Sequence, residues 1–394
     1  MKKLRKLSVI AMSFVLILAS GCKKENSVFL PVLTTNEVSS ISFNSATSGG
    51  SITSKGGSTV IARGVCWSST STPTISNNKT SDGRGIGLFT SSITGLSPET
   101  TYFVRAFATN SDGTAYGSVR QFKTSADPAN NPTALIPAGT FTMGSPESEV
   151  NSYLDETQHV VTLSAFRMSK YEITNAQYAA FLNAKSIGSD GLYAAGAYPT
   201  DTLIYASSDS SNWGLHFSGT QWMPVAGYET SPVINVTWYG AAEFATYVGG
   251  SLPTEAQWEY ACRAGTTSPF STGTCLTNLQ ANYYWGAPYG TCTNTVTTYP
   301  GKPQPVGTYA ANAYGLYDMH GNVWEWCADW YGDYPTSPQT NPTGSATGLY
   351  RVFRGGSWYS DAEYCRSAYR ESNYLSNYPN SYSIDVGFRV VFVP

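Results

Sequence analysis

Hydrophobic and polar positions alternate with a period of two between residues 31 and 124. The clearest stretch runs from Tyr102 to Ala108, where even-numbered and odd-numbered side chains form two separate sets. An Asn-Ser-Asp-Gly sequence follows at 110–113 and is typical of a turn between two strands. Because short strands and Gly/Ser/Thr/Asn turns recur here without a helical period, this region predicts a small all-β module.

A different pattern follows a segment with the Pro, Asn and Ala composition of a linker, residues 125–132. Residues 133–394 form one large unit that contains nine of the ten tryptophans. Apolar spacing predicts one helix around Tyr178 and a second at about 239–247. Thr254 is placed to cap a third, short helix. The second unit is therefore expected to contain helices, in contrast to the first.

The N-terminus has the pattern of a targeting signal. Four of the first six residues are basic, and the apolar run from Leu7 to Leu18 is too short for a membrane span of ~20 residues. The following Ala-Ser-Gly-Cys sequence resembles a bacterial lipobox, in which the chain is cut before the cysteine and that cysteine is acylated. We therefore expect a lipoprotein signal peptide at 1–21, a lipid anchor on Cys22 and a tether at 22–30. The alternative is an ordinary secretory signal with an incidental cysteine.

Lys23 and Lys24 directly after Cys22 favour sorting to the outer membrane, where the protein would be a lipoprotein exposed to the periplasm or to the cell surface. Several acyl chains anchor a protein stably where a single chain does not. The remaining six cysteines would then lie in an oxidising compartment, in which disulfides persist.

Composition narrows the classes of function. Aromatic residues make up 14% of the 394 residues, which excludes a mostly disordered chain. The formal net charge is −3, and nucleic-acid binding is not expected because phosphate contacts require clustered Lys and Arg. Three histidines leave little material for a His-rich metal centre.

Residues 96–102, Leu-Ser-Pro-Glu-Thr-Thr-Tyr, resemble the corner before strand F in fibronectin type III domains. In such a corner Tyr102 would hydrogen-bond back to the chain a few residues upstream. The resemblance implies a fibronectin III-like β-sandwich over 31–124. Since nothing in it carries chemistry, we interpret this module as a spacer that holds the next domain away from the membrane.

Eight short motifs occur in a set order along the larger unit: 136–144, 170–175, 232–238, 252–260, 315–318, 321–326, 354–358 and 387–389. Together they resemble the formylglycine-generating-enzyme, or sulfatase-modifying-factor, family over residues 133–394. The resemblance implies an α+β C-type-lectin-like domain with little regular structure. In such a domain aromatic bodies fill the gaps between irregular segments.

Oxidases of that family convert a sulfatase cysteine to formylglycine with a copper ion held by two cysteines five residues apart. Counted from the Gly-Gly-Ser motif, these catalytic positions are Ser360 and Cys365 here. Because soft thiolates select Cu(I), a serine cannot replace one of them. Counted back from the Arg-Ser-Ala-Tyr-Arg run at 366–370, Cys365 is not a catalytic position at all. In both registers copper is not expected, and we lean against an enzyme.

The resemblance also implies a disulfide from Cys262 to the Arg-Ser-Ala-Tyr-Arg strand. The family's partner position is Ser367, and Cys365 lies two residues earlier, on the same face of an extended strand. We therefore expect a Cys262–Cys365 disulfide, although sequence alone does not establish connectivity.

Cys275 and Cys292 flank one loop and are expected to form a second, local disulfide. Cys66 and Cys327 then remain as free thiols, which are more often buried than reactive.

Family members bind calcium with one side chain after Gly-Leu-Tyr, two backbone carbonyls and the glutamate of Trp-Glu-Trp. The matching positions are Asp318, Gly321, Val323 and Glu325, and oxygen ligands with two carboxylates suit Ca²⁺. The alternative is that Glu325 pairs with a buried arginine such as Arg354 or Arg389.

The segment between Ser357 and Asp385 is rich in Tyr, Ser and Asn. These residue types dominate antibody paratopes, because Tyr offers large contact area and Ser and Asn adapt their hydrogen bonds. The segment resembles the variable region of proteins diversified by retroelements; ordinary, non-catalytic family members carry similar loops. Both interpretations predict a ligand-binding surface, with these candidates: Trp358, Tyr359, Ser360, Asp361, Tyr369, Ser372, Asn373, Tyr374, Ser376, Asn377, Tyr378, Asn380 and Tyr382.

The sequence thus predicts a cell-envelope lipoprotein whose C-terminal domain is non-catalytic and binds a protein or glycan ligand. One alternative is a formylglycine-generating oxidase that acts on sulfatase cysteines. Another is a structural subunit of an envelope secretion or motility machine.

Overall fold

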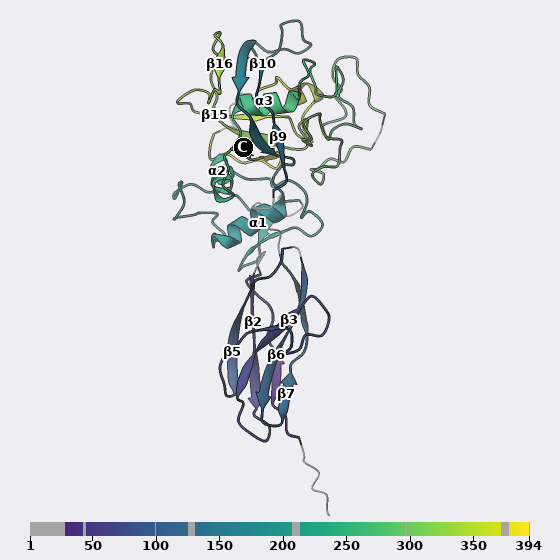
Figure 1. The fold of residues 1–394 in the computed structure, drawn as a ribbon. Helices are drawn as coiled ribbons and strands as arrows, with labels where there is room; N and C mark the ends of the chain where they lie inside the picture. The colour runs from purple at the N-terminus through teal and green to yellow at the C-terminus, as the bar shows by residue number, and fades with distance from the viewer. Residues whose placement is uncertain are drawn as a thin grey trace, which may run out of the picture.

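The computed structural model describes residues 28–41, 45–98, 100–124, 131–206, 213–295, 298–371 and 378–393. The signal segment and Cys22 lie outside these ranges. A narrow β domain and a larger mixed domain follow each other end to end (Figure 1). Within the described ranges no helix is both long and apolar enough to cross a membrane.

The first domain consists of two antiparallel sheets. One sheet has the order β1 (Val32–Thr35), β2 (Ser45–Ser54), β5 (Gly87–Thr94). The other has the order β4 (Asn78–Lys79), β3 (Ala62–Ser68), β6 (Thr101–Asn110), β7 (Gly113–Tyr116), with β8 (Arg120–Lys123) also paired to β6. The prediction of an all-β module is confirmed.

The alternating pattern places one set of side chains between the two sheets. Val65 and Val104 of one sheet and Ile93 of the other are fully buried in the same hydrophobic cluster. At the corner before β6, the Ser97 backbone N–H donates to the Tyr102 hydroxyl over 3.0 Å. This hydrogen bond is the one expected at that corner, while the fibronectin III-like assignment stays a prediction.

In its described residues the larger domain has many short strands and three short α-helices. The helices are α1 (Asn175–Ala184), α2 (Trp238–Tyr247) and α3 (Glu255–Arg263). The strands are β9 (Thr133–Ile136), β10 (Gly139–Met143), β11 (His159–Leu163), β12 (Phe166–Ser169), β13 (Leu215–Phe217), β14 (Trp222–Pro224), β15 (Trp324–Trp330), β16 (Gln339–Thr340), β17 (Arg351–Arg354), β18 (Val386–Gly387) and β19 (Val391–Phe392). They form the sheets β10-β11-β16, β19-β12-β9, β13-β14 and β17-β15-β18.

A threonine begins each helix. Thr174 and Thr254 form capping boxes with Gln177 and Gln257, and the Thr237 hydroxyl accepts from the Gly240 N–H. Such caps satisfy backbone donors that have no partner inside the helix. The three helices therefore begin where the local sequence predicts, including at Thr254.

The sheet β17-β15-β18 positions the segment predicted to bind ligand. Strand β15 lies in the middle, antiparallel to β17 and parallel to β18. The chain leaves β17 at Arg354 and returns to β18 at Val386, so both ends of residues 355–385 are held by one strand. The buried rings of Trp258 and Trp326 fill the surrounding core, as the tryptophan content predicts.

Candidate functional site

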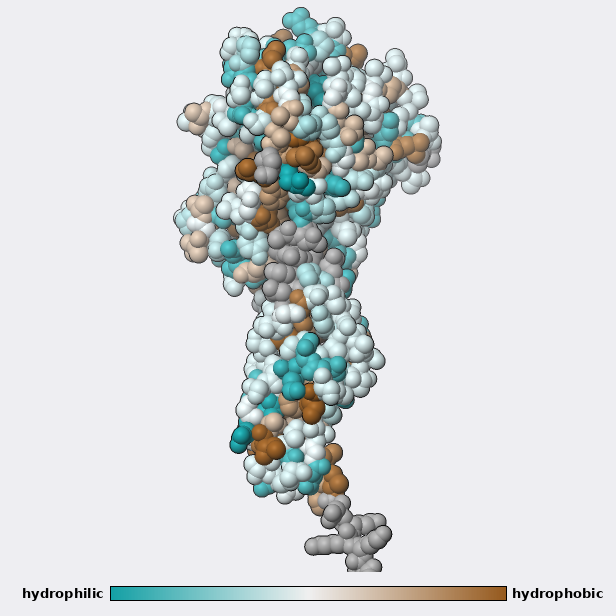
Figure 2. Space-filling model, in the orientation of Figure 1, coloured by the Kyte–Doolittle hydropathy of each residue, from teal (hydrophilic) through white to brown (hydrophobic). Residues whose placement is uncertain are grey.

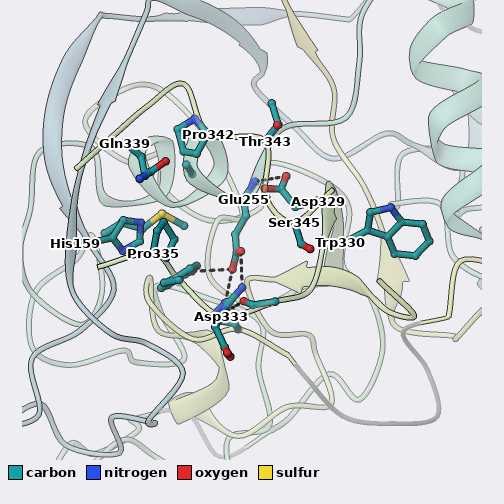
Figure 3. A pocket seen from close by; sticks show the side chains of 16 residues that line it. His159, Glu255, Asp329, Trp330, Asp333, Pro335, Gln339, Pro342, Thr343 and Ser345 are labelled. Carbon is teal, nitrogen blue, oxygen red and sulfur yellow. Dashed lines mark hydrogen bonds and ion pairs between the residues drawn. The ribbon is translucent and has the colours of Figure 1, made fainter. Parts of the chain in front are cut away.

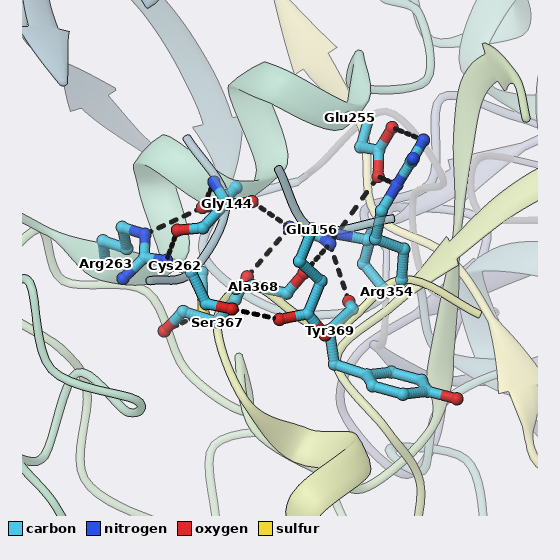
Figure 4. Close-up of polar contacts among 12 residues, drawn as sticks. Gly144, Glu156, Glu255, Cys262, Arg263, Arg354, Ser367, Ala368 and Tyr369 are labelled. Atoms are coloured by element: carbon cyan, nitrogen blue, oxygen red, sulfur yellow. Dashed lines mark hydrogen bonds and ion pairs between the residues drawn. The ribbon is translucent and has the colours of Figure 1, made fainter. Parts of the chain in front are cut away.

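Beneath the 355–385 segment lies a network of buried ion pairs that starts from α3. Glu259 accepts from Arg354 over 2.5 Å and from Arg263 over 2.8 Å. Glu255 binds Arg370 through two hydrogen bonds of 2.8 Å. Figure 4 shows Glu255 and Arg263 of α3 together with Arg354 and the irregular segment that carries Ser367 and Ala368.

A fourth arginine extends this network. Arg366 is fully buried and pairs with Glu149 over 2.8 Å and with Glu156 over 2.6 Å. Each of these arginines has a carboxylate partner, so Glu255 and Glu259 are engaged in buried ion pairs. Breaking a buried pair by removing one partner typically costs ~3–5 kcal/mol.

The two family cysteine positions lie in a tightly packed turn after β17. The Ser360 hydroxyl accepts from the Ser357 N–H over 3.1 Å and lies 3.0 Å from the Ser357 hydroxyl, which donates to Asp385. Cys365 ends a 3₁₀ helix (Ala362–Cys365). Its sulfur contacts the backbone at Gly356, where a Cβ atom would lie only 2.4 Å from Sγ.

Burial raises the pKa of the Cys365 thiol, so the side chain stays protonated. Copper-binding and nucleophilic cysteines need the thiolate, and they lie in exposed, electropositive surroundings that lower the pKa. Ser360 offers a hydroxyl already engaged by Ser357. Neither position therefore provides a ready thiolate.

The predicted Cys262–Cys365 disulfide is wrong: both thiols are free and buried. The prediction assumed an extended strand from Cys365 to Ser367, whereas the 3₁₀ helix turns Cys365 away from that face. Cys262 instead lies with its Sγ 3.6 Å from the hydroxyl of Ser367, the partner position that the family resemblance indicates.

Two other cysteine predictions are confirmed. Cys275 and Cys292 form a disulfide, and Cys66 and Cys327 are free and buried.

At the predicted calcium site, both oxygens of Glu325 are engaged. They accept two hydrogen bonds of 2.6 Å from Arg389 and one of 2.8 Å from the Trp258 ring nitrogen. Asp318 accepts from the Gly307 N–H over 2.6 Å, and burial raises its pKa to about 6. Glu325 thus pairs with a buried arginine, as the alternative interpretation stated.

Buried carboxyl groups nevertheless outnumber cations at this place. Burial, and next the charges of Asp318 and Glu325, raise the pKa of Glu172, while the neighbouring Arg389 lowers it. Oxygen ligands suit hard cations such as Ca²⁺ in general. In the described ranges no three His, Cys, Asp or Glu side chains form a metal-binding group, and calcium stays a prediction.

The predicted ligand-binding residues differ in how far their side chains are exposed to solvent. Tyr359 is 69% exposed and Tyr382 46%; Tyr378 and Asn380 are exposed as well. Ser360 and Asp361 are half-buried. The candidates Ser372, Asn373, Tyr374, Ser376 and Asn377 lie outside the described residues.

Two of the candidates are wrong as surface contacts. Tyr369 is buried and packs against Trp324, with ring centroids 5.9 Å apart. Trp358 is buried and meets the ring of Trp213 edge-on at 5.3 Å. Tyr369 lies between buried Ala368 and Arg370, and Trp358 follows buried Ser357, so both candidates belong to buried stretches of the segment.

Tyrosines outside the predicted segment extend the exposed surface. Tyr205 stacks on Tyr382 with ring centroids 4.0 Å apart, and Tyr350 contacts Tyr378 at 4.9 Å. The backbone of this region is tied to the start of α2, because the Trp238 N–H donates to the Pro379 carbonyl. Sequence reasoning missed Tyr205 and Tyr350, since each lies in a segment far away along the chain.

A cavity of about 380 Å³ lies beside the first turn of α3 (Figure 3). Glu255 and Asp329 line it, and the Glu255 backbone N–H donates to Asp329 Oδ2 over 2.9 Å. Burial, and next the charge of Glu255, raises the pKa of Asp329 to about 7. Because Glu255 is bound by Arg370, this cavity belongs to the ion-pair network.

The fold and the cysteine positions define a formylglycine-generating-enzyme-like domain of C-type-lectin-like type. The chain belongs to the sulfatase-modifying factor enzyme 1-like domain family, whose model matches residues 119–393. It is 34% identical over 276 residues to the formylglycine-generating enzyme of Streptomyces coelicolor, covering 64% of this chain and 87% of that protein. It is 32% identical over 273 residues to that of Mus musculus, covering 64% and 73%.

Among solved structures, the chain is similar to Treponema denticola variable protein 1. The TM-score is 0.40 at 24% sequence identity, and the match covers 70% of this chain and 96% of that one.

Proposed function

We propose that this protein is a non-catalytic, lipid-anchored binding protein whose larger domain captures a protein or glycan ligand. The observation that carries the proposal is the state of the two family cysteine positions. Ser360 cannot supply a thiolate, and Cys365 is a buried thiol whose sulfur contacts Gly356. A member of this family that lacks the copper ligands retains the fold, and function resides in the surface grafted on it.

The exposed part of the 355–385 segment supports a binding role. Tyr359, Tyr378 and Tyr382 present aromatic surface beside polar Asn380, and Tyr205 and Tyr350 enlarge it. Tyrosine binds with little loss of side-chain entropy and combines apolar contact with a hydroxyl. Such a surface suits recognition of a protein or a glycan.

Within this proposal residues 31–124 form a fibronectin III-like spacer and Cys22 carries the lipid anchor. The protein is then an outer-membrane lipoprotein that presents its larger domain away from the bilayer. We further propose that the Tyr/Ser/Asn positions of the 358–383 segment are diversified by a retroelement. A reverse transcriptase gene nearby, with a near-copy of this coding segment that differs mainly at adenines, is the expected genomic signature; its absence would contradict diversification alone.

The enzymatic alternative is tested with copper and a Cys-x-Pro-x-Arg peptide. We expect no formylglycine, as measured by peptide mass, from the protein as it is. Formation of formylglycine that is abolished by Cys365→Ala would overturn the proposal.

The binding surface is tested on a glycan array and with a displayed random-peptide library. We expect that hits for the parent protein are lost in a Tyr359→Ala, Tyr378→Ala, Tyr382→Ala variant. Leu154→Ala is the matched control, because Leu154 is 98% exposed elsewhere on the same domain. Equal binding of the triple variant would show that the ligand binds another surface, as a subunit of a larger assembly would.

A further inference from the structure

Exposed hydrophobic side chains gather at one end of the β-sandwich. The strand register places the start of β1, the end of β2 and the start of β5 together, because Val32 pairs with Ser54 and Gly87 with Ile52. In the other sheet, Ala62 at the start of β3 pairs with Thr109 near the end of β6. One end of the domain therefore contains the chain entry at 28–31 and the loops that begin β3, β5 and β7.

Several hydrophobic side chains at this end face solvent. Their exposed fractions are 64% for Val28, 58% for Phe29, 39% for Leu30, 58% for Val32, 52% for Ile61, 57% for Ile86 and 76% for Leu88. Among the described residues of the sandwich, the one other exposed large hydrophobic side chain is Val119, at 38%. Figure 2 shows brown surface at this lower end, away from the larger domain. Contiguous exposed hydrophobic surface marks a contact with a protein or a membrane.

Residues 28–30 are held in place on the sandwich. The Phe29 N–H donates to the Asp112 carboxylate over 3.0 Å, and the Phe29 carbonyl accepts from the Asn110 side chain over 2.7 Å. The Gly57 N–H donates a second hydrogen bond to that carbonyl. The predicted tether at 22–30 therefore ends before residue 28, because residues 28–30 belong to the folded end of the sandwich.

Basic residues accompany the hydrophobic ones. Lys55 and Arg84 are exposed in the loops of this end, and the one acidic side chain in the turn at 111–112, Asp112, already accepts the Phe29 N–H. Lys23 and Lys24 stand just upstream in the sequence. Hydrophobic side chains combined with Lys and Arg favour the interface of an anionic bilayer.

Covalent geometry brings this end close to any lipid attached to Cys22. Six residue steps separate Cys22 from Val28, and an extended chain spans at most ~3.6 Å per residue, or roughly 20 Å in all. An acylated Cys22 therefore keeps Val28 within roughly 20 Å of the membrane, whatever path the chain takes. The linker to the larger domain leaves the sandwich after β8, near Ser97 and Thr100 at the opposite end.

From these observations we infer that the end of the sandwich formed by residues 28–32, 55–61, 84–88 and 111–112 lies on the bilayer surface. There it docks Val28, Phe29, Ile86 and Leu88 into the headgroup region. This inference rests on the proposed anchor at Cys22 and adds an orientation to it: the sandwich stands on its hydrophobic end, and the ligand-binding domain points outward.

The test uses the acylated full chain in vesicles of phosphatidylethanolamine and phosphatidylglycerol. A photoreactive benzophenone side chain replaces Phe29 in one sample and Leu154, 98% exposed on the larger domain, in the control. After irradiation we expect lipid adducts at position 29 with at least about tenfold higher yield than at position 154. Equal yields, or a cross-link from position 29 to a second copy of the chain, would overturn the inference.

A second measurement removes the hydrophobic contact itself. Phe29→Ser with Leu88→Ser changes exposed side chains, and the folded sandwich is expected to tolerate both. In chains that carry Cys22→Ser, this pair should reduce sedimentation with the vesicles by roughly tenfold. Leu154→Ser with Leu349→Ser is the control and should leave sedimentation unchanged; an equal loss in both would contradict the inference.

Failure of the anchor and failure of the docking are distinguishable. The intact mass of the N-terminal peptide reports whether Cys22 is acylated. If it is not, the Cys22 thiol is coupled to a maleimide lipid, which is selective because Cys66, Cys262, Cys327 and Cys365 are buried. The same cross-linking then tests the hydrophobic end alone.

Discussion

The segment between β17 and β18 contains two sets of side chains with opposite roles. Arg366 and Arg370 are buried and bound to carboxylates of other segments, whereas Tyr359 and Tyr382 face solvent. The first set links the segment to α3 and to residues 149–156. The carboxylates there therefore constrain which residues can stand at the arginine positions. The second set has room to vary without disturbing the fold. This difference shows how one loop can be rigid underneath and adaptable outside.

The largest effect is expected from the buried set. Arg354→Ala leaves the carboxylate of Glu259 buried without its closest partner and should lower the free energy of unfolding by ~3–5 kcal/mol. Urea denaturation of the full chain measures this loss. Arg120→Ala is the control: its pair with Glu37 is exposed, and breaking it should cost no more than ~1 kcal/mol. Equal losses would contradict the distinction between buried and exposed sets.

A pH dependence should come next in size. Burial raises the pKa of Asp329 from its usual 3.8 to about 7, so the folded protein keeps a proton that the unfolded chain releases. Its contribution to stability is present below pH ~4 and is lost as pH rises through ~7, by up to roughly 4 kcal/mol. Asp329→Asn should flatten this part of the stability profile in thermal melts from pH 4 to 8; an unchanged slope would refute it.

Calcium is expected to act on the surplus of buried carboxylates. At a concentration one hundred times its dissociation constant, a bound ion stabilises the folded state by ~2.7 kcal/mol. A thermal melt with calcium, compared with one in chelator, should therefore show a higher midpoint, and Asp318→Ala should abolish the difference. Identical midpoints for the parent protein would show that calcium does not bind there and that Glu325 only pairs with Arg389.

The smallest effect on stability is expected at the exposed tyrosines. Tyr359→Ala and Tyr382→Ala should each change the free energy of unfolding by no more than ~0.5 kcal/mol, although binding is lost. Urea denaturation and the array assay on the same samples separate the two quantities. A large loss of stability would show that these tyrosines, like the buried arginines, are needed for the fold.

Local features were predictable from the sequence because few residues specify them. The cap at Thr254 depends on the next three residues, and the Cys275–Cys292 disulfide closes a loop of sequence separation 17. The Tyr102 corner also depends on neighbours, since its hydroxyl binds the N–H of Ser97. The Cys262–Cys365 prediction was wrong because it assumed an extended backbone where a 3₁₀ helix forms.

The sequence by itself determined the all-β module and the family of the larger domain, and it places Ser360 where the family resemblance, counted from the Gly-Gly-Ser motif, expects a cysteine. These depend on residue identity and order along the chain. Only the tertiary structure decided that Trp358 and Tyr369 are buried, that Tyr205 and Tyr350 join the exposed tyrosines, and that Glu325 binds Arg389. Burial and ion pairing depend on distances between segments far apart in the chain, and such distances are set only when the segments pack together.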